Sequence, residues 1–285
     1  MPDAMLPAFA PIAGEWAMVQ ARLARADEHY ATFGRIWADY LDRLPHRLEP
    51  TPEDDGTVTV RVRQHAKLPV ELSIAFGELL YELRSALDNC LYAVAVLVSG
   101  EDPPPDAKRL EWPIRLNPAE WQSQASRYRR LPASITEALE AIQPYQAETP
   151  SWNALRILHE LARVDRHRSP HGLGIYLTEA RLMAVNTEVE VLFLRGGGIV
   201  SGGDVIARVR PLVGVELAPS NFDLDLDFTV EVTSIEDSLG PNGVIGRPWG
   251  PLDSRLRALS RASREYTEGL FAIAAIQVGQ AESRP

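Results

Sequence analysis

One stretch of the chain is dense in side chains that can do chemistry. Residues 158–171 read LHELARVDRHRSPH and contain three histidines, two carboxylates and three arginines. Histidine can bind a metal or transfer a proton near neutral pH, and arginine binds carboxylate and phosphate groups. The segment could therefore form a metal site, an acid–base site or an anion site, and the spacing of its residues helps to separate these alternatives.

The spacing disfavours a metal site. The zincin motif H-E-x-x-H needs a second histidine where Arg163 stands, and the carboxylate motif E-x-x-H fails at the same residue. His159 and His167 are eight residues apart, which is about 12 Å along a helix and too far to share one ion. We therefore expect no metal ion and no other cofactor.

Residues 150–168 are predicted to form an amphipathic helix with two different faces. At about 100° per residue, one arc collects apolar side chains such as Leu158 and Leu161. The opposite arc holds more basic than acidic groups, which is typical either of a solvated surface or of a site for a small anion. The candidate anion-binding residues are Trp152, Arg156, His159, Arg163 and His167.

Two charged residues of this helix, Asp165 and Arg168, fall on its apolar arc. An unpaired charge buried there would cost several kcal/mol, so both residues need partners. A second helix, predicted over residues 71–98, carries Arg84 and Asp88 at the edge of its apolar stripe. We predict a structural ion-pair network in which Arg84 pairs with Asp165 and Asp88 pairs with Arg168. The alternative is that this network orients a catalytic His167.

The composition restricts the class of protein. The chain has 285 residues, of which 45% are hydrophobic and 24% charged, with a net charge of −10. This acidity disfavours nucleic acid as the main partner, because phosphate binding needs positive charge. The single cysteine, Cys90, excludes an internal disulfide. The chain starts without the basic segment of a signal peptide and has no apolar run long enough to span a membrane, so we expect a cytoplasmic protein.

Two long amphipathic helices are predicted, one near each end of the chain. Apolar residues recur at alternating spacings of three and four over residues 16–44 and again over residues 252–273. These helices are expected to pack on each other or on a second subunit. We expect a homodimer through them.

The periodicity changes to two between residues 172 and 234, which indicates strands. The sequence DLDLDFTVEV, residues 223–232, predicts one strand with its leucines on one face and its acidic residues on the other, opposite Arg208 and Arg210. Residues 188–194 and 204–211 are predicted to form a hairpin around the glycines at 196–198. A further strand is predicted at residues 57–63, after a loop at residues 45–56.

These elements predict an α+β fold. It is a mostly helical bundle with long N- and C-terminal helices and an antiparallel β-sheet inserted before the last helix. We expect one domain over residues 1–285, with a helical part formed by 13–171 and 250–280 and a β-sheet part formed by 172–235.

Four short motifs occur in a recognisable order: ELRSALDN (82–89), EWPI (111–114), IQPY (142–145) and LHELARVDRHR (158–168). Together they resemble an uncharacterised family of bacterial proteins with LRSALDH, FPI, QPY and a helix ending in IDKHR. The resemblance covers residues 80–170 and implies no established activity. It also suggests a distant similarity to HEPN domains, helical nucleases with an Arg-x(4–6)-His motif. Arg84 matches that arginine, but Asn89 stands at the histidine and cannot act as a general acid or base.

Two functional hypotheses remain open. The first is a non-catalytic binding or assembly protein with an anion site on the 150–168 helix. The alternative is a metal-independent, HEPN-like nuclease or phosphodiesterase-type enzyme in defence or toxin function, which would use His159 or His167 with nearby arginines. An enzyme needs a histidine with a perturbed pKa facing a cleft, whereas a scaffold does not.

Overall fold

The chain divides into two compact units, and each is described separately. The described residues of the computed structural model are 7–167, 172–184, 189–212, 222–233, 247 and 249–282, and the side chains of 7, 8, 164–167, 184, 281 and 282 lie outside the description. The helical unit comprises Met1–Thr32, Ile74–Pro170 and Asp253–Pro285. The sheet unit comprises Phe33–Ser73 and His171–Leu252.

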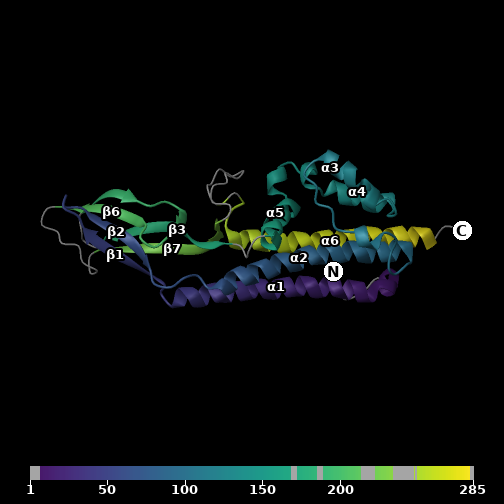
Figure 1. The fold of residues 1–285 in the computed structure, drawn as a ribbon, viewed down its shortest axis with the longest axis horizontal. Helices are drawn as coiled ribbons and strands as arrows, with labels where there is room; N and C mark the ends of the chain where they lie inside the picture. Colours follow the sequence, from purple (N-terminus) through teal and green to yellow (C-terminus); the bar gives the residue numbers. More distant parts are fainter. Residues whose placement is uncertain are drawn as a thin grey trace. The chain divides into compact units, whose positions relative to one another are not determined.

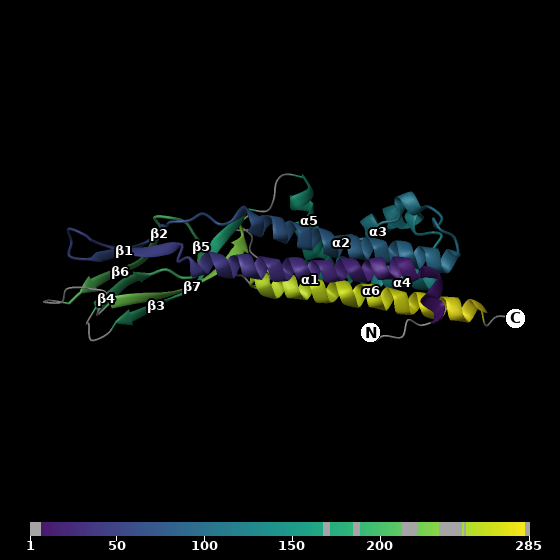
Figure 2. The same ribbon diagram turned by 90° about the horizontal axis from the view of Figure 1, so that it is seen from below.

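Three long helices form the frame of the helical unit. They are α1 (Ala13–Asp42), α2 (Val70–Ser99) and α6 (Leu252–Glu282), and within this unit they run side by side in both views (Figures 1 and 2). The end of α1, from Phe33, and the first residues of α2, up to Ser73, belong to the sheet unit. No described helix combines the length and the apolar character that crossing a membrane requires.

The predicted packing of the two terminal helices on each other is confirmed. The rings of Trp16 and Phe271 lie 4.3 Å apart between centroids, and Arg264 Nη2 donates to Asp27 Oδ2 at 3.0 Å. Most residues of the three–four spacing are buried or half-buried within this single chain, and the fully buried ones include Val19, Leu23, Ala26, Leu256, Leu259 and Leu270. Leu44, at the end of the spacing, is the exception: it follows the end of α1 and is exposed. The homodimer stays a prediction.

Helix α2 is the most deeply buried of the three. Leu79, Leu83 and Leu87 have no exposed surface, as their helical spacing predicts. Cys90 continues this buried face, and burial raises the pKa of its thiol well above the ordinary value. The thiol is therefore protonated at neutral pH, and it contacts the carbonyl oxygen of Thr267 at 3.7 Å.

Shorter helices connect α2 to the sheet unit. They are α3 (Pro118–Gln124), α4 (Ala133–Ala141) and α5 (Ala154–His167), joined by 3₁₀ turns that include Pro144–Gln146 and Pro150–Trp152. Asn117 caps α3, because its side chain accepts a hydrogen bond from the backbone N–H of Glu120.

The sheet unit contains two antiparallel sheets. The four-stranded sheet has the order β1 (His46–Pro52), β2 (Val58–Gln64), β6 (Val205–Pro211), β4 (Val189–Leu194). The three-stranded sheet has the order β5 (Gly198–Val200), β3 (Leu173–Ala184), β7 (Phe222–Val232). The α+β class, the long terminal helices and the position of the sheets before the last helix are thus confirmed (Figure 1).

The inner faces of the two sheets share one apolar core. It follows from the alternation of apolar and polar residues, which places every second side chain on the same face. The buried members come from both sheets and are Val60, Val62, Leu177, Val200, Ile206, Ala207 and Leu224.

Two strand predictions need correction. The segment 45–56 was predicted as a loop, but it contains β1, which pairs with β2. Its prolines are tolerated because β1 is an edge strand, where a missing N–H donor need not break a ladder. Strands β4 and β6 pair as predicted. The segment between them is not a tight hairpin turn, because it contains β5, which pairs with β3 in the other sheet.

The partners of the acidic face of β7 also differ from the prediction. Arg181 on β3 lies 3.5 Å from Asp225 and 3.3 Å from Asp227. Arg208 instead pairs with Asp55, and Arg210 pairs with Glu190. The reason is topological, since β7 neighbours β3 and not β6.

Candidate anion site

Helix α5 carries the predicted site and is positioned by a side-chain cap. The Oδ1 atom of Asn153 accepts hydrogen bonds from the backbone N–H groups of Leu155 at 2.9 Å and Arg156 at 3.3 Å. These are the donors that a helix start leaves without partners, so the cap sets the first turn. The α-helix therefore begins at Ala154, and residues 150–152 form a separate 3₁₀ turn.

The five predicted anion-binding residues do not share one environment. Trp152 is 45% exposed in the 3₁₀ turn, and Arg156 is engaged by Glu160, with 2.7 Å between Nε and Oε1. Arg163 is exposed, whereas His159 is half-buried. The side chain of His167 lies outside the described residues.

Arg84 on α2 is a buried arginine whose positive charge acts on His159 of α5. Only 9% of its side chain is exposed, and its Nη2 donates to the carbonyl oxygen of Trp112 at 2.7 Å and lies 3.3 Å from Asp88 Oδ1. Asp88 Oδ1 also accepts the backbone N–H of Trp112 at 2.8 Å. The two charged residues of α2 thus hold the segment that carries Trp112. Arg168 and the side chain of Asp165 are outside the described part, so the interhelical pairs stay a prediction.

The buried amide of Gln143 holds the same segment from the other side. Its Nε2 donates to the carbonyl oxygens of Pro113 at 3.1 Å and Leu139 at 2.7 Å, and its Oε1 accepts the backbone N–H of Arg115 at 2.8 Å. Gln143 has no exposed surface, so these bonds are shielded from water. The motifs EWPI and IQPY are therefore in direct contact in the folded chain.

Arg115 was missed by sequence reasoning and lies next to this contact. Its Nη1 donates to the carbonyl oxygen of Ile114 at 3.2 Å, and its Nη2 lies 3.5 Å from Glu111 Oε1. Only 15% of the side chain is exposed. In the sequence, Arg115 could have been recognised by its position directly after the motif EWPI, in which Pro113 restricts the backbone.

The electrostatics of His159 bring these residues together. The pKa of the His159 imidazole is lowered from its ordinary value, first by burial and then by the positive charges of Arg84, Arg163 and Arg115; Glu160 acts in the opposite direction. The imidazole is therefore neutral at neutral pH. We call the group formed by Arg84, Trp112, Arg115, His159 and Arg163 the basic site.

Three nitrogen atoms of the basic site are buried without an acceptor. They are Nη1 of Arg84, Nε1 of Trp112 and Nε of Arg115, and none of them has a hydrogen-bond partner among the described residues. A buried N–H without an acceptor costs about 1–3 kcal/mol, so such atoms are rare in folded proteins. All three atoms belong to residues joined by the contacts of the Trp112 segment, and two of these residues, Arg84 and Arg115, also lower the pKa of His159.

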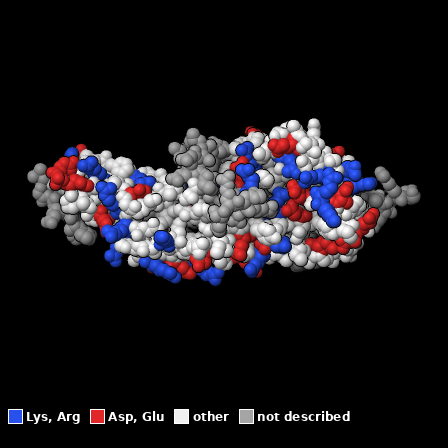
Figure 3. Space-filling model, viewed as in Figure 1, with Lys and Arg blue, Asp and Glu red and all other residues white. Residues whose placement is uncertain are grey.

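The surface near α5 is not uniformly basic. Figure 3 shows Lys and Arg side chains over α5 and over the segment that holds α3 and α4, with acidic side chains beside them. The basic site is therefore a local feature within an acidic protein, and the charges of its two partly buried arginines, Arg84 and Arg115, are screened less by salt than exposed charges are.

Asn89 is not part of this site. It lines a separate cavity of about 280 Å³ with Gly14 and Glu15 of α1. Arg84 contacts the segment of Trp112 instead, so the two residues of the Arg-x4-Asn motif point to different neighbours.

Metal binding has no geometric support in the described part of the chain. There, no three or more His, Cys, Asp or Glu side chains are grouped closely enough to hold an ion. Comparison of the chain with family models, with curated proteins and with solved structures finds no match.

Proposed function

We propose that this chain is a binding protein for a small anion with a carboxylate or phosphate group, and that the basic site holds that anion. The observation that carries the proposal is the set of three buried N–H groups, on Arg84, Trp112 and Arg115, that have no acceptor among the described residues. Guanidinium and indole N–H groups are donors only, so each needs an acceptor, and the oxygen atoms of a carboxylate or phosphate group are suitable acceptors.

The charge of the basic site fits a small ligand. Its three arginines are opposed by Asp88, which lies 3.3 Å from Arg84, and by Glu111, which lies 3.5 Å from Arg115. The remaining positive charge suits one anionic group and would not neutralise a polyanion such as nucleic acid. Because Arg84 is held by Trp112, its guanidinium is ordered before the ligand arrives, which reduces the entropy lost on binding.

The proposal predicts that binding changes the ionisation of His159. A bound anion opposes the positive charges of Arg84, Arg115 and Arg163, which lower the pKa of this histidine in the free protein. We therefore expect saturating phosphate to raise the pKa of His159. The measurement is an NMR titration of the histidine Cε1–H signals with and without phosphate, and a second series with acetate separates phosphate from carboxylate binding.

His46 in the sheet unit is the matched control for this titration. Burial lowers the pKa of His46 as well, but its second cause is His65 and not an arginine cluster. Phosphate should leave the pKa of His46 unchanged. A pKa of His159 that stays constant up to millimolar phosphate and acetate would refute the anion site.

A second candidate function is favoured by the neutral state of His159. A neutral imidazole next to arginines can accept the proton of a ribose 2′-hydroxyl while the arginines stabilise the phosphate charge. This is the metal-independent nuclease or phosphodiesterase-type alternative.

The two functions differ in the behaviour of RNA. As a binding protein, the chain should leave single-stranded RNA intact during hours of incubation in excess EDTA, analysed on a denaturing gel. Cleavage that is lost in His159→Asn but kept in His65→Asn would instead establish the nuclease and replace the proposal of a binding protein.

A further inference from the structure

A second cavity lies entirely within the sheet unit. Its volume is about 320 Å³, and its walls come from the end of α1, from the start of β1 and from β7. Pockets that bind small molecules usually have volumes of about 300–1,000 Å³. The cavity is therefore large enough for a small ligand.

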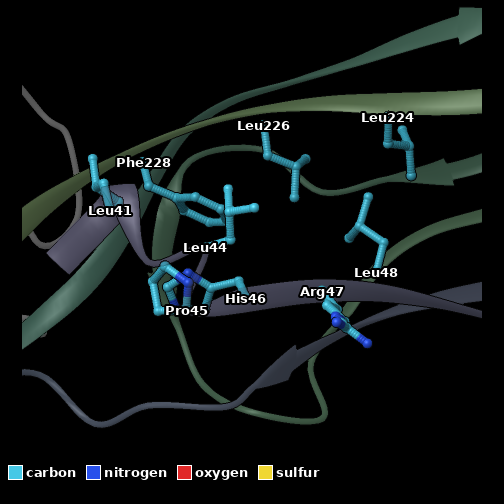
Figure 4. Close-up of a pocket in the computed structure, with 9 residues that line it drawn as sticks. All are labelled: Leu41, Leu44, Pro45, His46, Arg47, Leu48, Leu224, Leu226 and Phe228. Atoms are coloured by element: carbon cyan, nitrogen blue, oxygen red, sulfur yellow. The ribbon is translucent and has the colours of Figure 1, made fainter.

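The walls of this cavity are mainly apolar. Leu48 on β1 and Leu226 and Phe228 on β7 pack against the core of the two sheets on one side and line the cavity on the other. Figure 4 shows the side chains of Leu44, Leu48, Leu226 and Phe228 directed toward one another across the space between β1 and β7. An apolar occupant would therefore extend the core of the sheet unit.

Leu44 is placed at this cavity at a cost to the folded protein. Its backbone φ is +49°, in the left-handed region, and its side chain is 78% exposed. Glycine is the usual residue after a helix in this conformation, because a side chain there is strained. An exposed leucine also gains little from burial in the free protein. An occupant that covers Leu44 would recover the apolar burial that the free protein lacks.

The polar residues of the wall carry no charge into the cavity. The His46 ring packs on Phe228 at 5.0 Å between centroids, and burial followed by the charge of His65 lowers the pKa of His46, so the ring is neutral at neutral pH. The guanidinium of Arg47 points away from the leucines in Figure 4. The nine lining residues include no carboxylate, so nothing in the wall would balance a cationic ligand.

We propose that this cavity binds a small uncharged molecule with an aliphatic body, packed between β1 and β7 and covered at its mouth by Leu44. This site lies in the sheet unit, shares no residue with the basic site and does not depend on the anion proposal.

The test uses the full chain and 1-octanol as the probe in isothermal titration calorimetry. We expect saturable binding of one molecule per chain, and weaker binding of octanoate and octylammonium, whose charges would have to be desolvated. Leu44→Gly should weaken octanol binding about tenfold, the factor for losing contacts equivalent to about two methylene groups. The same variant should melt at a higher temperature than the wild type without ligand, because glycine relieves the left-handed backbone.

Leu116→Gly is the matched control. Leu116 is 41% exposed, lies in the helical unit and does not line the cavity. This variant should bind octanol as the wild type does and gain no thermal stability. The proposal is overturned by a linear, unsaturated heat of octanol addition, by unchanged affinity in Leu44→Gly, or by tighter binding of either charged analogue. Sedimentation that shows a wild-type dimer dissociated by Leu44→Gly would also overturn it, because a second chain would then occupy the cavity.

Discussion

Leu23→Asp should destabilise the helical unit by about 4 kcal/mol, because it places an unpaired carboxylate in an apolar interior. Leu23 lies on α1 and is only 1% exposed. Around it, α1 and α6 are joined by the contact of Trp16 with Phe271 and by the ion pair of Arg264 with Asp27. The measurement is urea unfolding followed by the helical circular dichroism signal.

Met18→Asp is the control for this change. Met18 is on the same helix but is 51% exposed, so the new carboxylate stays in water. We expect its free energy of unfolding to remain within about 0.5 kcal/mol of the wild-type value. If Leu23→Asp and Met18→Asp unfold at the same urea concentration, the described packing of α1 is wrong.

Arg84→Met should weaken phosphate binding about thirtyfold, or by about 2 kcal/mol, because a buried arginine that contacts an anion contributes strongly to affinity. The substitution also removes the bond from Nη2 to the carbonyl oxygen of Trp112 and the buried Nη1 that has no acceptor in the described structure. These two changes oppose each other, so we expect the free energy of unfolding to fall by no more than about 1–2 kcal/mol. Calorimetric titration with phosphate and urea unfolding of the same preparation measure both quantities.

Arg261→Met controls for the loss of one positive charge. The side chain of Arg261 is 76% exposed on α6, so its charge is well screened. Its removal should change phosphate affinity less than twofold at physiological salt, by about 0.4 kcal/mol or less. An equal loss of affinity in Arg84→Met and Arg261→Met would mean that phosphate responds to net charge alone, and that no specific site exists around Arg84.

The sequence alone was sufficient for the long helices and for the inner faces of the strands that it predicted. The spacing of Val19, Leu23 and Ala26 predicts one buried stripe, and the alternation in β7 places Leu224 and Val230 on the buried face, as observed. Such periodicities are local, since they follow from the geometry of a single helix or strand. The charged residues 84 and 88 could likewise be recognised from their place beside an apolar stripe.

The sequence was insufficient wherever a residue's partner came from another element. Arg208 and Arg210 were assigned to the acidic face of β7, but the strand order gives those carboxylates to Arg181. The strand β1 was hidden by its prolines, which only an edge position permits. In both cases the deciding quantity is which strands are neighbours, and no local pattern contains it.

The candidate sites divide in the same way. The sequence identified α5 as a helix with more basic than acidic residues on one face. It also drew attention to Arg84 on α2, but as part of an ion-pair network and not as an anion-binding residue. It gave no indication of Arg115. The tertiary structure decided that Arg84, Arg115 and Arg163 all act on His159, and that Gln143 holds the segment between them. The physical reason is that electrostatic interactions depend on distance in space and on burial, which arise when helices distant in the chain pack together.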